Sequence, residues 1–239
     1  MSSALAYSLV AGLGNVAGAV VVSRGAARGL LVIEHTVAFG AGLMLTVAIT
    51  EILPEALARS GSAAPWLVLG GYLAVHLTQH TLTPHFHFGE ETHTVRPAAG
   101  TAALVGLLLH TFFDGVAIAS AFLVGPALGL MVFLAILIHK LPEGVTIASL
   151  MLAAGRSARA AVWSAALLGA ATVAGVLLTD TRAFLGRHGL AVSGGVTLYV
   201  AASNLVPEFQ GKRGWKLPVA FFLGAGACFL AQALLEAVT

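Results

Sequence analysis

Long apolar stretches recur along the whole of this 239-residue chain and constrain its fold more than any other feature. Each is about 20 residues long, which is the length that a helix needs to cross a hydrocarbon layer of roughly 30 Å. Only 9% of the residues are charged, whereas a soluble globular domain is usually about a quarter charged. The chain is therefore predicted to be an all-α, polytopic membrane protein.

Glycine, proline and arginine residues divide the sequence into segments, and each segment is predicted to form one transmembrane helix. We expect eight helices in a single domain covering residues 1–239. The expected ranges are 4–22, 30–58, 64–82, 99–124, 126–154, 159–179, 188–208 and 217–237. The first stretch lacks the basic leader and cleavage site of a secretory signal, so it is expected to remain as a permanent helix.

The distribution of lysine and arginine predicts how the chain lies in the membrane. One set of alternate loops holds eight basic residues and the other holds three. The positive-inside rule assigns the richer set to the cytoplasm, which places both termini outside the cell membrane. The richer set is Arg24, Arg28, Arg96, Arg156, Arg159, Lys212, Arg213 and Lys216, and the poorer set is Arg59, Arg182 and Arg187.

Composition also argues against several classes of partner and site. The net charge of +2 is too small to indicate a nucleic-acid partner. The only cysteine is Cys228, so neither a disulfide framework nor a cysteine-rich zinc cluster is expected.

An internal repeat carries the ionisable residues that stand out from the apolar background. From His110 the sequence reads HTFFDGVAIAS, and from His139, 29 positions later, it reads HKLPEGVTIAS. The two segments share His, an acid, Gly, Val, Ile, Ala and Ser in the same order. Because ionisable side chains inside a membrane are costly, such residues are candidates for a functional site.

The spacing of the repeat predicts that its four ionisable side chains meet. His110 and Asp114 are four residues apart on one helix face, as are His139 and Glu143. A turn near Gly125 folds the two helices into an antiparallel hairpin, which places both imidazoles roughly 20 Å from the turn. Each acid then lies about 6 Å to one side of the imidazoles. The four groups are expected to bracket one ion, with one carboxylate facing each membrane surface.

Two imidazoles and two carboxylates suit zinc or ferrous iron, with manganese and cobalt as further options, whereas copper(I) prefers sulfur ligands. Antiparallel repeats around a mid-membrane site are typical of transporters, so the metal is interpreted as a transported substrate and not as a prosthetic group. The alternative function is an intramembrane zinc hydrolase, in which the same ligands activate water. A purely structural role, as hydrogen bonds that hold the hairpin together, is a third reading.

The repeat resembles the metal-binding helices of the ZIP family of divalent-metal transporters. The residues that carry the resemblance are His110, Asp114, Gly115, His139, Pro142, Glu143 and Gly144. The resemblance implies eight helices, uptake of divalent metal such as zinc or cadmium into the cytoplasm, a centre of one or two ions, and a homodimer. This sequence departs from the family at Thr111, where Asn is usual, and at Lys140 and Thr172, where relatives carry acids.

Lys140 beside two carboxylates is predicted to take the place of a second cation, because an ammonium group and a nearby metal ion repel each other. One bound ion is therefore expected. The alternative is that Lys140 points toward the inner side and pairs only with Glu143.

Weaker candidates for metal binding lie elsewhere in the chain. Met44 resembles a position near the metal path of the family, and two Pro-Glu pairs at 54–55 and 207–208 are expected near the outer entrance and inner exit. The polar stretch 83–96 holds His85, His87 and His93 and is expected on the cytoplasmic side. The weaker candidates are Met44, Glu51, His76, His80 and Glu208.

Overall fold

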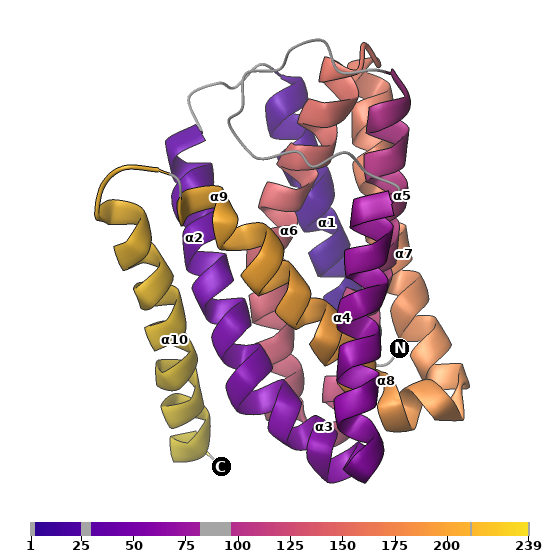
Figure 1. Cartoon of the computed structure of the whole chain (residues 1–239), viewed down its shortest axis with the longest axis vertical. Helices are drawn as coiled ribbons and strands as arrows, with labels where there is room; N and C mark the ends of the chain where they lie inside the picture. Colours follow the sequence, from indigo (N-terminus) through magenta and orange to yellow (C-terminus); the bar gives the residue numbers. More distant parts are fainter. Residues whose placement is uncertain (1–2, 25–29, 82–96, 211, 239) are drawn as a thin grey trace.

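A computed structural model describes residues 3–24, 30–81, 97–210 and 212–238. Within these ranges all regular structure is helical, and most helices run along the long axis of the molecule (Figure 1). Six helical runs among the described residues are long and apolar enough to cross a membrane. The all-α fold of a polytopic membrane protein is thereby confirmed, whereas the number of eight spans stays a prediction.

The helices follow one another with short connections, and their order is simple. The first half comprises α1 (Ser3–Ser23), α2 (Leu30–Val47), the π-helix η2 (Ala48–Ile52), α3 (Leu53–Ser60), the 3-10 turn η3 (Gly61–Ala63) and α4 (Ala64–Thr81). The second half comprises α5 (Pro97–Val124), α6 (Pro126–Ala153), α7 (Ala158–Thr181), α8 (Ala183–Tyr199), the π-helix η4 (Val200–Leu205), α9 (Pro207–Gln210) and α10 (Lys216–Val238).

Two boundaries differ from the expected ranges in ways that local contacts explain. α8 begins at Ala183, five residues before the expected position 188, so Arg187 belongs to a helix and the prediction of a loop there is wrong. The polar side chains at this end are accommodated because His188 Nδ1 lies 2.9 Å from Ser60 Oγ of α3. The run from Glu34 to Thr81 reverses at Gly61, whose φ of 55° favours glycine.

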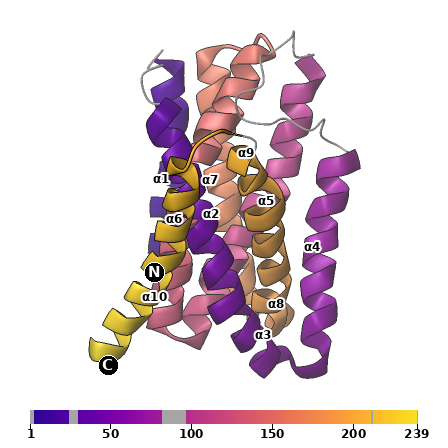
Figure 2. The same ribbon diagram turned by 60° about the vertical axis from the view of Figure 1, so that its left-hand side comes forward.

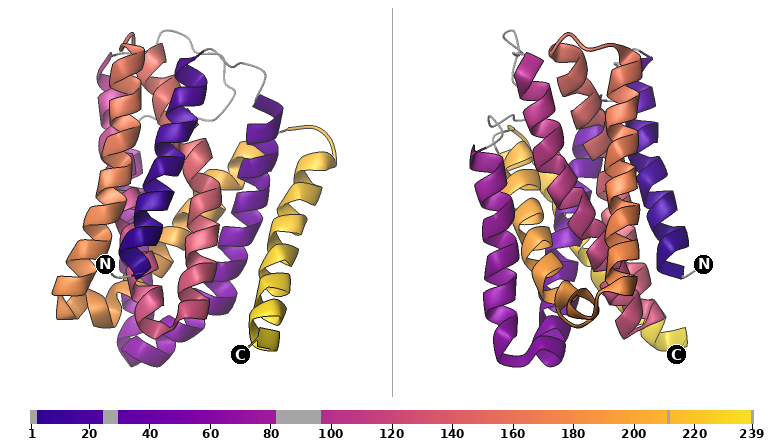
Figure 3. Two further views of the ribbon diagram at one scale, coloured as in Figure 1. Left: turned by 180° about the vertical axis from the view of Figure 1, so that it is seen from behind. Right: turned by 90° about the vertical axis from the view of Figure 1, so that its right-hand side faces the viewer.

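The helices pack in two groups. α1, α5, α6 and α7 contact one another, while α2 packs along α10 and α4 packs along α8. The groups meet where α5 lies against α8 and α2 lies against α6. α10 forms one edge of the molecule beside α2 (Figure 2). α1 begins and α10 ends toward the same end of the bundle (Figure 3).

Glycine residues at several crossings bring backbones into direct contact. At Gly71 of α4 an added Cβ would meet the backbone carbonyl of Val192 in α8, whereas at neighbouring Gly70 it would meet nothing within 4 Å. Backbone atoms cannot move aside as a flexible side chain does, so only glycine fits the first position. The two adjacent glycines therefore differ sharply in what they permit.

We predict that Gly71→Ala lowers the melting temperature of the detergent-solubilised protein, because the methyl group pushes α4 away from α8. Overpacking of this kind costs about 1–3 kcal/mol, or roughly 2–12 °C in a chain of this size. Gly70→Ala is the matched control and should leave the melting temperature unchanged or raise it, since alanine favours helices. Equal effects of both substitutions on the thermal unfolding curve would contradict this account of the α4–α8 crossing.

Candidate metal centre

Two long helices joined by a single residue position the candidate site. α5 ends at Val124, α6 begins at Pro126, and the two helices pack against each other as an antiparallel hairpin. Pro126 occupies the first turn of α6, where its missing N–H leaves no hydrogen bond broken. α6 continues through Pro142. The repeat segments therefore lie on neighbouring helices at similar distances from the turn.

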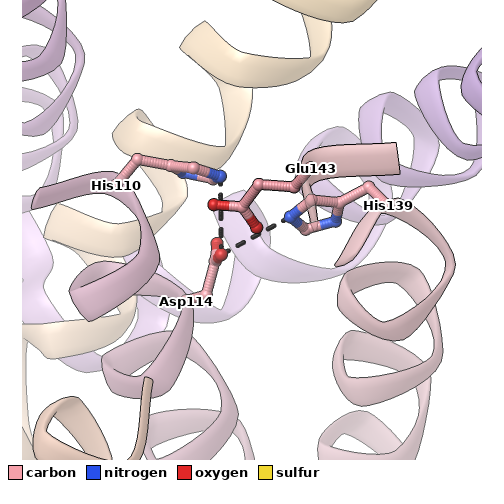
Figure 4. A group of neighbouring side chains, drawn as sticks. All are labelled: His110, Asp114, His139 and Glu143. Atoms are coloured by element: carbon pink, nitrogen blue, oxygen red, sulfur yellow. Dashed lines mark ion pairs between the residues drawn. The ribbon is translucent and has the colours of Figure 1, made fainter. Parts of the chain in front are cut away.

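The four ionisable side chains of the repeat converge inside the bundle (Figure 4). One ligand atom from each of His110, Asp114, His139 and Glu143 lies within 4.8 Å of the other three. Their exposed fractions are 2%, 1%, 3% and 8% respectively, so the protein interior surrounds them. Among the described His, Cys, Asp and Glu residues, no other group of three or more has this geometry.

Asp114 lies between the two imidazoles. His110 Nε2 and His139 Nε2 are each 3.4 Å from Asp114 Oδ2. His139 Nδ1 lies 3.2 Å from the carbonyl oxygen of Ala135, and a ring nitrogen that faces a carbonyl oxygen must carry the proton. The Nε2 atom of His139 then keeps a free lone pair, which is the tautomer that a metal ion requires.

Several polar atoms of this group have no hydrogen-bond partner among the residues that the structure describes. They are His110 Nδ1, His139 Nε2 and Asp114 Oδ1. Buried polar atoms are almost always paired, so unpaired ones at one place call for an explanation. Lone pairs from imidazole and carboxylate groups match the donor set of a divalent transition metal.

Lys140 lies in the same cluster and is fully buried, with 0% of its surface exposed. Its Nζ atom is 2.6 Å from Asp114 Oδ2 and 2.6 Å from Glu143 Oε2. The alternative that Lys140 pairs only with Glu143 is therefore wrong. The expectation of carboxylates facing opposite membrane surfaces is also wrong, because both side chains bend toward the one ammonium group.

Two uncharged side chains complete the surroundings of Glu143. The Thr111 hydroxyl donates to Glu143 Oε1 at 2.5 Å. The Asn15 side chain of α1, with its amide nitrogen facing the site, donates to Glu143 Oε2 at 3.3 Å and to the Lys140 carbonyl oxygen at 2.6 Å. Sequence analysis missed Asn15; a carboxamide within an otherwise apolar helix was the signal that pointed to it.

The weaker candidates do not join this group. Met44 is fully buried in the apolar core, and Glu51 accepts a hydrogen bond from Gln232 of α10. His76 and His80 are exposed on α4 with ring centroids 3.9 Å apart. Thr172 is buried, and its hydroxyl donates to the Leu168 carbonyl within α7 at 3.4 Å. The Glu208 side chain and residues 82–96 lie outside the described residues.

Comparison with known proteins identifies the family. A family model described as ZIP zinc transporter matches residues 76–232, well over half of the chain. The chain belongs to the ZIP family. Comparison with individually curated proteins gives no match. The matched segment contains both repeat helices, whereas Asn15 lies outside it.

Membership of the ZIP family and the buried His, Asp, His and Glu group together support transport of a divalent metal ion. The metal is the cargo of such a protein. The spanning helices are those of a multi-pass membrane protein.

We predict that Lys140→Met destabilises the metal-free protein, because two buried carboxylates then face each other without a cation. Loss of one partner of a buried ion pair costs about 3–5 kcal/mol, or roughly 6–20 °C in melting temperature. Added zinc should restore more stability to this variant than to the parent, since the metal supplies the missing positive charge.

The matched control is Lys212→Met, which removes a 2.7 Å ion pair with Glu34 whose side chains are 29% and 33% exposed. A pair this exposed contributes about 0–1 kcal/mol, so the variant should melt close to the parent with or without zinc. A Lys140→Met variant that behaves in the same way would show that the ammonium group does not balance the two carboxylates.

Proposed function

We propose that this ZIP protein takes up divalent transition metal ions into the cytoplasm and binds each ion between His110, Asp114, His139 and Glu143. The observation that carries the proposal is the convergence of four buried ligand atoms within 4.8 Å of one another. Unpaired lone pairs on both imidazoles and on Asp114 support it. A hairpin tied only by hydrogen bonds would leave fewer such atoms unpaired.

Zinc is the proposed principal cargo. Two imidazole nitrogens and two carboxylate oxygens supply the four ligands that a tetrahedral zinc ion takes in proteins. Ferrous iron, manganese, cobalt and cadmium accept the same donors and are the proposed competitors. The absence of a thiolate from this ligand set disfavours copper(I).

A single ion per chain is the proposed occupancy. The ammonium group of Lys140 already contacts both carboxylates at 2.6 Å, and a second divalent ion at that place would be repelled by it. Lys140 therefore supplies the charge that a second metal ion would otherwise bring.

The proposed arrangement has eight spans in the cytoplasmic membrane, with both termini outside. Arg24, Arg156, Lys212 and Arg213 lie at or near connections at the end of the bundle opposite the chain termini, which is the distribution expected of a cytoplasmic face. The resemblance to ZIP proteins supports a homodimer within the lipid bilayer.

We predict that purified protein in proteoliposomes accumulates zinc beyond its own binding capacity, and that His110→Ala and Glu143→Ala abolish this uptake. Removal of a ligand should reduce flux by about 100-fold or more, since loss of an outer-shell partner alone typically costs 10–100-fold. Zinc inside the vesicles is measured with an enclosed fluorescent indicator. A hydrolase or a static metal site would bind zinc without carrying it inward.

The matched controls are His188→Ala and Glu55→Ala. His188 contacts Ser60 and Glu55 pairs with Arg59, both at helix ends away from the four ligands. Flux through these variants should equal that of the parent. Undiminished flux in folded His110→Ala and Glu143→Ala protein would remove the proposed site.

We also predict that equilibrium dialysis gives one zinc ion per chain, and that His139→Ala reduces the bound zinc to background. Two tightly bound ions per chain in the parent would contradict the role given to Lys140. Dialysis of Lys140→Met at the same zinc concentrations shows whether the ammonium group limits the occupancy.

A further inference from the structure

Asn15 is a fully buried polar side chain in the middle of α1, with 0% of its surface exposed. Its amide nitrogen donates to two oxygens of α6, the Glu143 carboxylate and the Lys140 carbonyl. α1 carries none of the proposed metal ligands, so a third helix reaches the site through this one residue. Burial of an amide without partners is costly, and these two hydrogen bonds remove that cost.

The two carboxylates of the site differ in how they are held. The Lys140 ammonium is the one hydrogen-bond donor to Asp114 among the described residues, and Asp114 Oδ1 has no partner there. Glu143 receives hydrogen bonds from Lys140, Thr111 and Asn15, so both of its oxygens are fixed. Glu143 is therefore the more firmly held carboxylate.

The kind of donor matters when a metal ion enters. A divalent cation repels the ammonium group of Lys140 and weakens its hold on both acids. The amide of Asn15 and the hydroxyl of Thr111 carry no net charge and are not repelled in this way. Only Glu143 then keeps hydrogen bonds that fix its direction, which is what a ligand needs if it is to be ready for the ion.

The backbone fixes Asn15 against α6. A Cβ atom added at Gly144, next to Glu143, would meet the backbone of Asn15, and one added at Gly14 would lie 3.1 Å from Lys140 Cβ. The two helices therefore touch directly on both sides of the amide. Asn15 is presented to Glu143 at a distance that neither helix can readily change.

We propose that Asn15 is a positioning residue for metal binding, which holds Glu143 in the ligand direction while the charged Lys140 is repelled by the entering ion. This inference rests on the proposed function, because it requires Glu143 to be a ligand. It assigns to α1 a part in the site that neither the repeat nor the matched family segment contains.

The test measures cobalt(II) binding to the purified full chain by visible absorption, whose intensity and wavelength report on the ligands of the ion. Asn15→Leu should weaken cobalt affinity roughly 10- to 100-fold and alter the spectrum, as loss of an outer-shell partner does. Asn15→Ala is measured beside it, because it removes the same amide without adding branches at the helix crossing. Ser8→Ala is the matched control, since Ser8 is equally buried on α1 and donates only to the Leu5 carbonyl of its own helix.

A double-mutant cycle with Glu143→Gln separates positioning from packing. If Asn15 acts through Glu143, then Asn15→Leu should change cobalt affinity less than about twofold in the Glu143→Gln background. Parent-like affinity in both Asn15 variants, or the same loss in both backgrounds, would overturn the inference while leaving the four-residue site intact. Parent-like cobalt binding by His110→Ala and Glu143→Gln would instead remove the metal site itself, and the role of Asn15 with it.

Discussion

The bridge from the Lys140 ammonium to Asp114 and Glu143 is the interaction on which the interior of this protein depends. Three ionised groups in an apolar bundle cost far more than any other residues of the chain, unless each has an opposite charge in contact. The two 2.6 Å contacts meet that requirement. They also fix where α5 and α6 face each other, because the short Asp114 side chain reaches Lys140 only when the two helices lie close.

Close packing around these charges comes from the glycine that follows each acid. A Cβ at Gly115, after Asp114, would meet the Thr172 carbonyl of α7, and a Cβ at Gly144, after Glu143, would meet the backbone of Asn15 in α1. The two halves of the repeat thus use the same residue type to admit two different helices. The result is a site closed by backbone on both sides, in which water has little access and charge interactions are strong.

The sequence predicted what depends on local spacing and short connections. The intervals between His110 and Asp114 and between His139 and Glu143, with the one-residue turn at Gly125, are sufficient to bring four ligand groups together. The partners of long or distant side chains were harder to predict. Lys140 has enough freedom to pair with one acid or with both, and Asn15 reaches Glu143 only through the packing of α1 on α6. The start of α8 was missed because Arg187 and His188 look like loop residues until the contact with Ser60 is known.

The charge of the site bears on why a transporter would carry a lysine there. Two carboxylates and one ammonium sum to one negative charge when the imidazoles are neutral, so a divalent ion brings the total to one positive charge. Without the ammonium the same ion would bring the total to zero and would be held more firmly. A transport site must bind its ion well enough to admit it and weakly enough to release it. Lys140 shifts that balance toward release, while the uncharged donors Thr111 and Asn15 keep Glu143 in place without adding repulsion.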